Sequence, residues 1–249
     1  MRADPARIAY LEALGVDVYF QRAATAEQGA AAPAPPAAGA PAAPVSERQA
    51  AAPAAASAAG DVARLDWTAL QTAVAACTRC RLHESRTQTV FGVGSHAAEW
   101  MIVGEAPGAE EDRRGEPFVG RAGQLLDQML LAVGLARDRV FIANVLKCRP
   151  PGNRDPSADE AQACRGFLDR QIALVAPRLI LAVGRIAAQH LLDTDAPLGR
   201  LRGRVHLLKS TEIPVVVTYH PAYLLRTPSQ KRKAWDDLCL ARQVAGRPS

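Results

Sequence analysis

The stretch that decides the fold of this 249-residue chain is Trp100-Met101-Ile102-Val103-Gly104-Glu105-Ala106-Pro107-Gly108. The apolar run from Trp100 to Val103 is typical of a buried strand, and Pro107 with Gly108 ends it abruptly. The carboxylate of Glu105 is therefore expected just past the carboxyl end of a strand, where open α/β sheets bind their ligands. The stretch predicts a strand that delivers an acidic side chain to a binding loop.

A second glycine-flanked turn follows in Gly115-Glu116-Pro117-Phe118-Val119-Gly120. It presents a lone aromatic side chain, Phe118, before a helical pattern opens at Gly123. A carboxylate and a flat ring on one connection suit a planar, neutral ligand better than a phosphate. Taken alone, the turn is equally compatible with a purely structural role, since glycine-rich turns are common in α/β proteins.

Four apolar runs predict buried strands, at residues 100–103, 140–145, 179–183 and 213–219. Helical patterns alternate with them at 123–133, 158–174, 186–192 and 232–243, and a further helix is predicted around 67–76. Strands that alternate with helices indicate a parallel sheet covered by helices on both faces. We therefore expect an α/β fold of three layers around a central, mostly parallel, four-stranded sheet.

The first 60 residues differ in composition from the rest of the chain. Residues 31–60 contain sixteen Ala and six Pro, so they cannot bury enough apolar surface to offset the entropy of ordering. We predict that residues 23–60 form a disordered linker and that residues 61–249 hold the folded domain. Residues 1–22 contain an apolar island too short to fold alone. Docking on a partner protein is one interpretation of that island, and packing on the domain or no binding role are the alternatives.

Basic residues gather toward the C-terminal part of a chain whose net charge is +5: Arg200, Arg202, Arg204, Arg226, Lys231, Arg232 and Lys233. Such a cluster suits a polyanion partner, although solvated surface charge explains the count as well. No signal peptide or membrane-spanning run is evident. We expect a monomer of the bacterial cytoplasm, where cysteines serve as ligands or buried thiols more often than as disulfides.

Four of the five cysteines suggest a metal site. Cys77 and Cys80 form a C-x-x-C pair, and Cys148 and Cys164 follow after gaps of 67 and 15 residues. Zinc ribbons usually carry two such pairs, whereas iron–sulfur clusters also take four cysteines, so the residues alone leave the metal open. Redox chemistry at the pair is disfavoured because the pair follows a helical pattern. Cys239, in the last predicted helix, is expected to be a core thiol.

Two polar side chains complete the pattern at predicted strand ends. Asn144 ends the second strand, and its amide offers a hydrogen-bond donor and an acceptor together. His220 opens a His-Pro sequence directly after the fourth strand. Taken singly, an Asn or a His at the end of a strand is more often a structural residue than a functional one. With Glu105 they form a constellation from three strand ends.

The string GEAPGAEEDRRGEPFVG, residues 104–120, closely resembles the first motif of the family 4 uracil-DNA glycosylases. These are the iron–sulfur-containing members of their superfamily, and the similarity extends over about residues 61–244. The resemblance implies a [4Fe-4S] cluster on Cys77, Cys80, Cys148 and Cys164. Such a cluster would staple the helix before the sheet to the long Pro-rich loop 148–156.

The same resemblance implies a DNA repair enzyme that flips uracil out of single- or double-stranded DNA. The enzyme would hydrolyse the N-glycosidic bond and leave free uracil and an abasic site. His220 would donate a hydrogen bond toward uracil O2, and Glu105 would lie near the sugar and the attacking water. A replication or repair protein is the partner that we expect for residues 1–22.

Four residues are assigned by the resemblance to substrate binding. Asn144 would read the O4 and N3–H edge of uracil, and Phe118 would stack on the extruded ring. Glu111 would sit against C5 and exclude the methyl group of thymine. Ala106, next to Glu105 in the first loop, completes the set.

Three alternatives are set against this interpretation. Superfamily members that bind uracil-DNA with little or no turnover carry a basic insertion that ends in a reactive His, and residues 148–157 contain no His. The family 5 enzymes have an apolar residue where Glu105 stands. The third alternative is a metal-stapled nucleotide-binding module without catalysis, which would leave uracil-containing DNA intact.

Overall fold

A six-stranded sheet forms the centre of the part of the chain that the computed structural model describes, residues 62–246. In chain order its strands are β1 (Val93–Gly94), β2 (Trp100–Gly104), β3 (Phe141–Asn144), β4 (Leu179–Val183), β5 (Val205–Leu207) and β6 (Pro214–Thr218). The spatial order is β1-β3-β2-β4-β6-β5. The predictions for residues 1–22 and 23–60 fall outside the described residues.

The α/β class is confirmed, but the predicted number of four strands is wrong. The inner strands β3, β2, β4 and β6 run parallel. The strands missing from the prediction are antiparallel edges, β1 against β3 and β5 against β6. Both are two or three residues long and partly or fully exposed, so they lack the apolar run by which a buried strand is recognised in a sequence.

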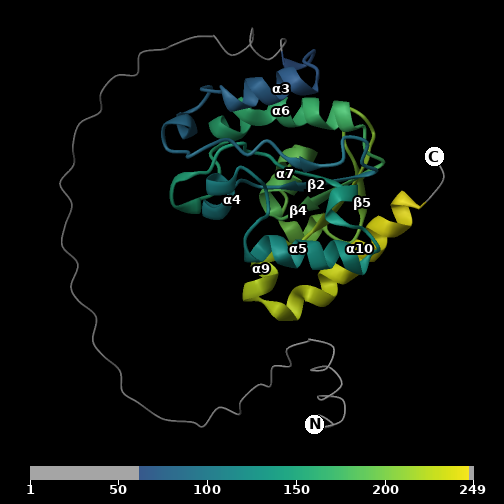
Figure 1. Ribbon diagram of the computed structural model, residues 1–249. Helices are drawn as coiled ribbons and strands as arrows, with labels where there is room; N and C mark the ends of the chain where they lie inside the picture. Colours follow the sequence, from purple (N-terminus) through teal and green to yellow (C-terminus); the bar gives the residue numbers. More distant parts are fainter. Residues whose placement is uncertain (1–61, 247–249) are drawn as a thin grey trace, which may run out of the picture. The chain divides into compact units, whose positions relative to one another are not determined.

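Helices cover both faces of the sheet (Figure 1). The α-helices are α3 (Trp67–Ala75), α4 (Ala109–Arg114), α5 (Arg121–Ala132), α6 (Ala158–Val175), α7 (Arg185–Leu192), α8 (Leu198–Leu201), α9 (Pro221–Arg226) and α10 (Lys231–Ala245). Short 3₁₀ turns are η1 (Arg81–Glu84), η2 (Arg137–Arg139), η3 (Pro151–Asn153) and η4 (Pro228–Gln230). The sequence did not predict α4, α8 and α9, which are too short to show a helical period. No helix among residues 62–246 combines the length and apolar character needed to span a bilayer.

Alternate residues of the inner strands enter two separate hydrophobic cores. In β2, Met101 and Val103 pack with residues of α3, α6 and α7, whereas Trp100 and Ile102 pack with residues of α5, α9 and α10. Figure 1 shows α3 beside α6, and α5 near α9 and α10 on the opposite side of the sheet. Because both faces are covered, β2, β3 and β4 are buried throughout and read as continuous apolar runs.

The parallel register brings the carboxyl ends of four strands to one edge of the sheet. Gly104 of β2 pairs with Asn144 of β3, and Val183 of β4 pairs with Thr218 of β6. The residues that follow these positions therefore leave the sheet on the same side. This edge is the floor of the candidate site.

Candidate active site

A cleft of about 420 Å³ opens at the carboxyl edge of the sheet. All six residues that the sequence assigned to chemistry or substrate binding line it: Glu105, Ala106, Glu111, Phe118, Asn144 and His220. Further lining residues come mainly from the loop after β3 and from α9: Pro150, Asn153, Arg154, Asp155, Ala222 and Arg226. The structure thus joins three strand ends, which are far apart in the sequence, in one hollow.

Asn144 lines this cleft and carries an unsatisfied acceptor. Its side chain is buried, and its Oδ1 has no hydrogen-bond partner among the described residues. Gly104 makes room for it, because a Cβ at that position would lie 2.4 Å from Oδ1 of Asn144 and 2.6 Å from Cζ of Phe118. A buried acceptor without a donor is costly, so a ligand N–H group that reaches Oδ1 would be favoured.

Phe118 is held in a strained backbone conformation. Its φ of 55° lies in the left-handed region, which bulky residues rarely adopt. Its buried ring stacks on that of His220, with 5.6 Å between ring centroids and 30° between planes. Oε1 of Glu111 fixes the turn by accepting hydrogen bonds from the backbone N–H groups of Val119 at 3.0 Å and Gly120 at 3.2 Å. Strain maintained in this way is typical of functional sites.

His220 enters the cleft as a neutral hydrogen-bond donor. It is the N-cap of α9, and its Nδ1 accepts a hydrogen bond from the backbone N–H of Ala222 at 3.1 Å. An Nδ1 that accepts places the ring proton on Nε2. Burial, assisted by the positive charge of Arg226, lowers the pKa of His220 to about 4. Near pH 7 the ring is therefore uncharged, with Nε2–H as its donor.

Glu105 is poised to change its charge near neutral pH. Burial, assisted by the negative charge of Asp155 and opposed by Arg185, raises the pKa of Glu105 to about 7. Asp155 is itself paired with Arg185, with 2.6 Å between Oδ2 and Nη2. A carboxyl group with such a pKa inside a cleft is a candidate for catalysis.

The loop that forms one wall of the cleft is anchored on the first turn of α6. Ser157 and Glu160 form a capping box there. Arg154 donates to both carboxylate oxygens of Glu160, at 2.8 and 2.6 Å, and holds the pKa of that carboxyl down to about 2. The sequence indicates this loop only as a partner of the cysteines. It does not show that Arg154 and Asp155 reach the cleft, because an irregular loop has no periodic pattern that indicates its contacts.

The predicted basic cluster does not act as one surface. Arg202 is only 11% exposed in its side chain and pairs with the buried Asp237, with 2.7 Å between Nη2 and Oδ2. Arg226 lines the cleft, whereas Arg232 and Lys233 are exposed at the start of α10. The cluster therefore divides into a structural ion pair and a smaller set of cations that an anion can reach.

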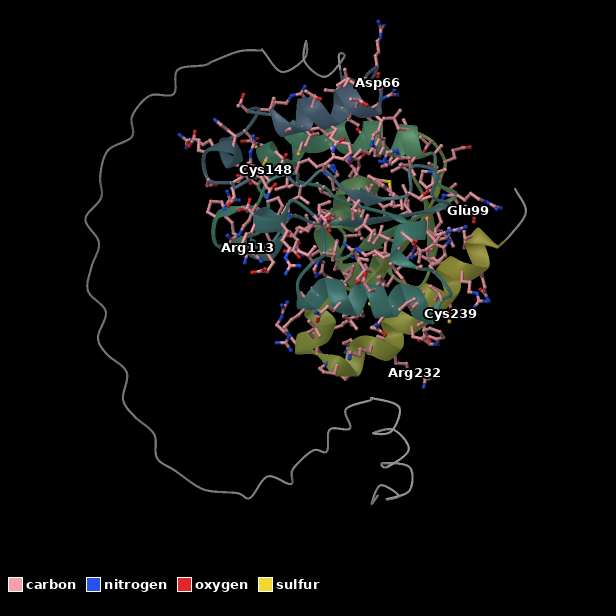
Figure 2. All side chains as sticks on the ribbon, viewed as in Figure 1. Asp66, Glu99, Arg113, Cys148, Arg232 and Cys239 are labelled. Carbon is pink, nitrogen blue, oxygen red and sulfur yellow. The ribbon has the colours of Figure 1, made fainter. Side chains whose placement is uncertain are left out.

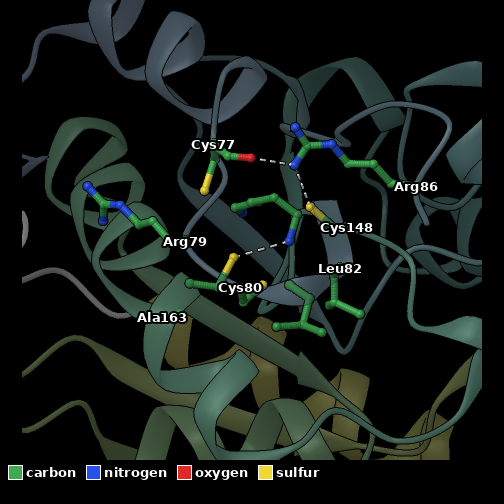
Figure 3. A pocket seen from close by; sticks show the side chains of 10 residues that line it. Cys77, Arg79, Cys80, Leu82, Arg86, Cys148 and Ala163 are labelled. Atoms are coloured by element: carbon green, nitrogen blue, oxygen red, sulfur yellow. Dashed lines mark hydrogen bonds between the residues drawn. The ribbon is translucent and has the colours of Figure 1, made fainter. Parts of the chain in front are cut away.

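Four cysteines from three parts of the chain line one small cavity (Figure 3): Cys77, Cys80, Cys148 and Cys164. Arg86 donates to Sγ of Cys148 at 3.1 Å and to the carbonyl of Cys77 at 2.8 Å. The backbone N–H of Lys147 donates to Sγ of Cys164 at 3.3 Å. Burial raises the pKa of Cys164 to about 12, although the nearby ammonium group of Lys147 opposes the shift.

Cys239 stands apart from these four, in α10 on the other side of the molecule (Figure 2). It is partly exposed, so the prediction of a core thiol is wrong. The buried stripe of α10 is instead Ala234, Asp237, Leu238 and Ala241. Across residues 62–246, no three His, Cys, Asp or Glu side chains are spaced to hold a single metal ion.

Comparison with known proteins gives consistent results. Residues 91–239 match the uracil DNA glycosylase superfamily. The chain is 41% identical to the type-4 uracil-DNA glycosylase of Archaeoglobus fulgidus over 180 residues, which are 70% of this chain and 90% of that protein. It is 43% identical to the type-4 enzyme of Sulfurisphaera tokodaii over 70% of this chain and 83% of that protein. For the type-4 enzyme of Pyrobaculum aerophilum the identity is 41%, over 71% and 93% of the two chains.

The close approach of Asn144 and Phe118 to Gly104 generates the first prediction. Gly104→Ala should displace both side chains and lower the free energy of unfolding by about 1–3 kcal/mol, the usual cost of overpacking. Urea denaturation measures this loss, and a crystal structure of the variant shows the displacement. Gly199→Ala is the matched control, because nothing lies within 4 Å of a Cβ at that position. Equal stability of the two variants would contradict the prediction.

Proposed function

This chain belongs to the type-4 uracil-DNA glycosylases, and we propose that its cleft holds a deoxyuridine flipped out of DNA while the N-glycosidic bond is hydrolysed. It is a DNA repair glycosidase that acts on uracil in DNA. The observation that carries the proposed site is the meeting of an unsatisfied buried acceptor, a neutral imidazole and a carboxyl group in one cleft. The base has to leave the stack because the bond cannot be reached inside the duplex.

Base recognition is assigned to Asn144 and Phe118. Oδ1 of Asn144 accepts from uracil N3–H, and the amide nitrogen donates to O4. Cytosine has no N3–H, so it would leave the buried Oδ1 without a donor, and this mismatch favours uracil. The ring of Phe118 stacks on the base, which contributes roughly 1–3 kcal/mol per base in comparable contacts.

Stabilisation of the leaving group is assigned to His220. As the glycosidic bond breaks, negative charge develops on the departing uracil, and Nε2–H of His220 donates to O2. The orientation of this donor is fixed in advance by the hydrogen bond from the N–H of Ala222 to Nδ1. A donor preorganised toward developing charge acts without further rearrangement in the transition state.

Glu105 is assigned to the sugar side of the reaction. The transition state has oxocarbenium character, so an ionised carboxylate next to the sugar lowers its energy. The same group orients the attacking water. Only the ionised carboxylate can stabilise the positive charge on the sugar. Because the pKa of Glu105 is about 7, the rate of excision should depend on pH near neutrality.

Glu111 and Ala106 are assigned to the fit of the base. Glu111 sits against C5 and excludes the methyl group of thymine. Its hydrogen bonds from Val119 and Gly120 give it the fixed position that such exclusion requires. Ala106 has a small side chain beside Glu105 and leaves room for the ligand.

We further propose that Cys77, Cys80, Cys148 and Cys164 hold a [4Fe-4S] cluster. The four thiols surround one cavity, and Arg86 and Lys147 donate N–H groups to two of the sulfur atoms. Donors of this kind are the outer partners that tune cysteine-ligated clusters. When bound, the cluster supplies a structural cross-link between the segment after α3, the loop after β3 and α6.

Contact with DNA is assigned to cations near the cleft. Arg226 lines it, and Arg232 and Lys233 are exposed on the following helix. Exposed cations of this kind contact phosphates and make binding weaker as salt rises. A monomeric state and the docking of a repair or replication protein on residues 1–22 stay predictions.

The activity and the role of His220 are tested together on an oligonucleotide that contains a single uracil. Alkali should cut the uracil strand after treatment with the enzyme and leave a matched thymine strand intact. His220→Ala should lower the single-turnover rate by about 10²–10³, the cost of losing a preorganised donor. His206→Ala is the control, since His206 bonds the carbonyl of Leu201 outside the cleft. An intact uracil strand would indicate a protein that binds uracil-DNA without cleaving it. A near wild-type rate for His220→Ala would exclude the proposed role of His220.

The cysteine site predicts that the purified protein is brown. Serine at position 77, 80, 148 or 164 should remove the visible absorption, because four thiolates are needed to hold the cluster. Cys239→Ser should keep it, because Cys239 lies on the other face of the sheet. Absorption spectra and elemental analysis after anaerobic purification measure the outcome. Zinc without iron would refute the cluster.

The pKa of Glu105 predicts how excision depends on pH. Its carboxyl is neutral below a pKa of about 7 and ionised above it, so the wild-type single-turnover rate should rise with pH through that value. Glu105→Gln should be slower and should lose this rise between about pH 6 and 8. Any change in rate caused by protonation of His220 should occur at lower pH, because the pKa of His220 is about 4. A Glu105→Gln variant with a near wild-type rate and an unchanged acid limb would exclude this role.

A further inference from the structure

Lys147 is a buried residue that lines the cysteine cavity and whose ammonium group reaches back to the end of β3. It is 1% exposed, and it directly precedes Cys148 in the chain. Its Nζ donates to the backbone carbonyl of Asn144 at 2.8 Å and to Oε1 of Gln171 at 2.6 Å. Burying an ammonium group is costly even when it is hydrogen-bonded. An apolar side chain would fill the same space without that cost, so the hydrogen bonds themselves call for an explanation.

These contacts connect the end of β3 to α6. Gln171 lies in α6, is fully buried, and donates from Nε2 to the carbonyl of Phe91 at 2.9 Å. The backbone N–H of Lys147 meets the same helix at Sγ of Cys164. Cys164 and Gln171 are two turns apart and therefore lie on one face of the helix. Lys147 is thus attached to α6 at two points along that face.

The carbonyl that Lys147 contacts lies beyond the pairing of β3 with β1. That edge pairing reaches only from Phe141 to Ile142. After Asn144 the chain turns, and the N–H groups of Val145 and Leu146 bond to the carbonyls of Gly104 and Glu105. The backbone around Asn144 therefore pairs with β2 on one side, and the carbonyl of Asn144 is bound by the ammonium group of Lys147.

We propose that Lys147 is a positioning residue that holds Asn144 against α6. The side-chain amide of Asn144 then faces the base in a fixed orientation. The inference rests on the proposed role of Asn144. A charge-assisted hydrogen bond is shorter and stronger than a neutral one, and the long lysine stem reaches both acceptors through the packed core. A displacement of about 1 Å in a positioning group can lower a rate on the order of 10²-fold.

A double-mutant cycle tests the inference on the full-length protein. Lys147→Met keeps an apolar side chain of similar length and removes the ammonium group. In the wild-type background it should lower the single-turnover excision rate by about 10–10²-fold. In the Asn144→Ala background it should change the rate by no more than about twofold, because no amide is left to position. Equal losses in both backgrounds, or no loss in either, would overturn the inference.

Two controls distinguish a loss of positioning from a general loss of protein structure. Arg170→Met removes a cation that belongs to α6 itself, whose Nε donates to the carbonyl of Leu65 at 2.6 Å, and should leave the rate within about twofold. The visible absorption per molecule of Lys147→Met should equal that of the wild type. Loss of absorption together with activity would assign Lys147 to the cysteine site and overturn its positioning role.

A second variant keeps the test decisive if Lys147→Met does not fold. Gln171→Met leaves the ammonium group in place but removes its anchor on α6, and it should show the same dependence on Asn144. The proposed role of Asn144 fails separately, if Asn144→Ala alone excises uracil at the wild-type rate. In that case the positioning role of Lys147 falls with it. A slow Asn144→Ala enzyme with additive losses would overturn only the role of Lys147.

Discussion

Parallel pairing of the inner strands is the constraint on which the rest of this structure depends. Because β2, β3, β4 and β6 run in one direction, every chain segment that leaves a carboxyl end emerges at the same edge. Glu105, Asn144 and His220 are therefore neighbours in space although 114 residues lie between the first and the last. Burial of both sheet faces makes this frame rigid, and a rigid frame can hold catalytic groups at fixed separations.

Burial also sets the charges of the two ionisable groups in the cleft. The same desolvation raises the pKa of Glu105 to about 7 and lowers that of His220 to about 4, since in both cases it disfavours the charged form. In the mechanism that we propose, the neutral imidazole of His220 donates to the developing uracil anion. The carboxyl of Glu105, with a pKa of about 7, is ionised beside the positive charge that develops on the sugar.

The cysteine cavity and the cleft are separate sites that share structural elements. Cys164 and Gln171 belong to the helix that Lys147 links to Asn144. On the other side, Arg86 contacts Cys148, and the next residue, Thr87, donates its N–H to the buried carboxylate of Asp112 in α4. The cluster that we propose on the cysteines would therefore stabilise the segments that carry the walls of the cleft.

The sequence by itself determined the α/β class and the residues that line the cleft floor, because buried strands and the turns after them are local patterns. Glu105 to Phe118 lie on one connection, and their motif is readable without the fold. Only the tertiary structure decided the rest: the edge strands β1 and β5, the wall formed by Arg154 and Asp155, the exposure of Cys239 and the bridge through Lys147. These features depend on contacts between residues that are distant in the chain. The periodic pattern of a short segment does not indicate which partner a short strand, an irregular loop or a buried lysine will contact.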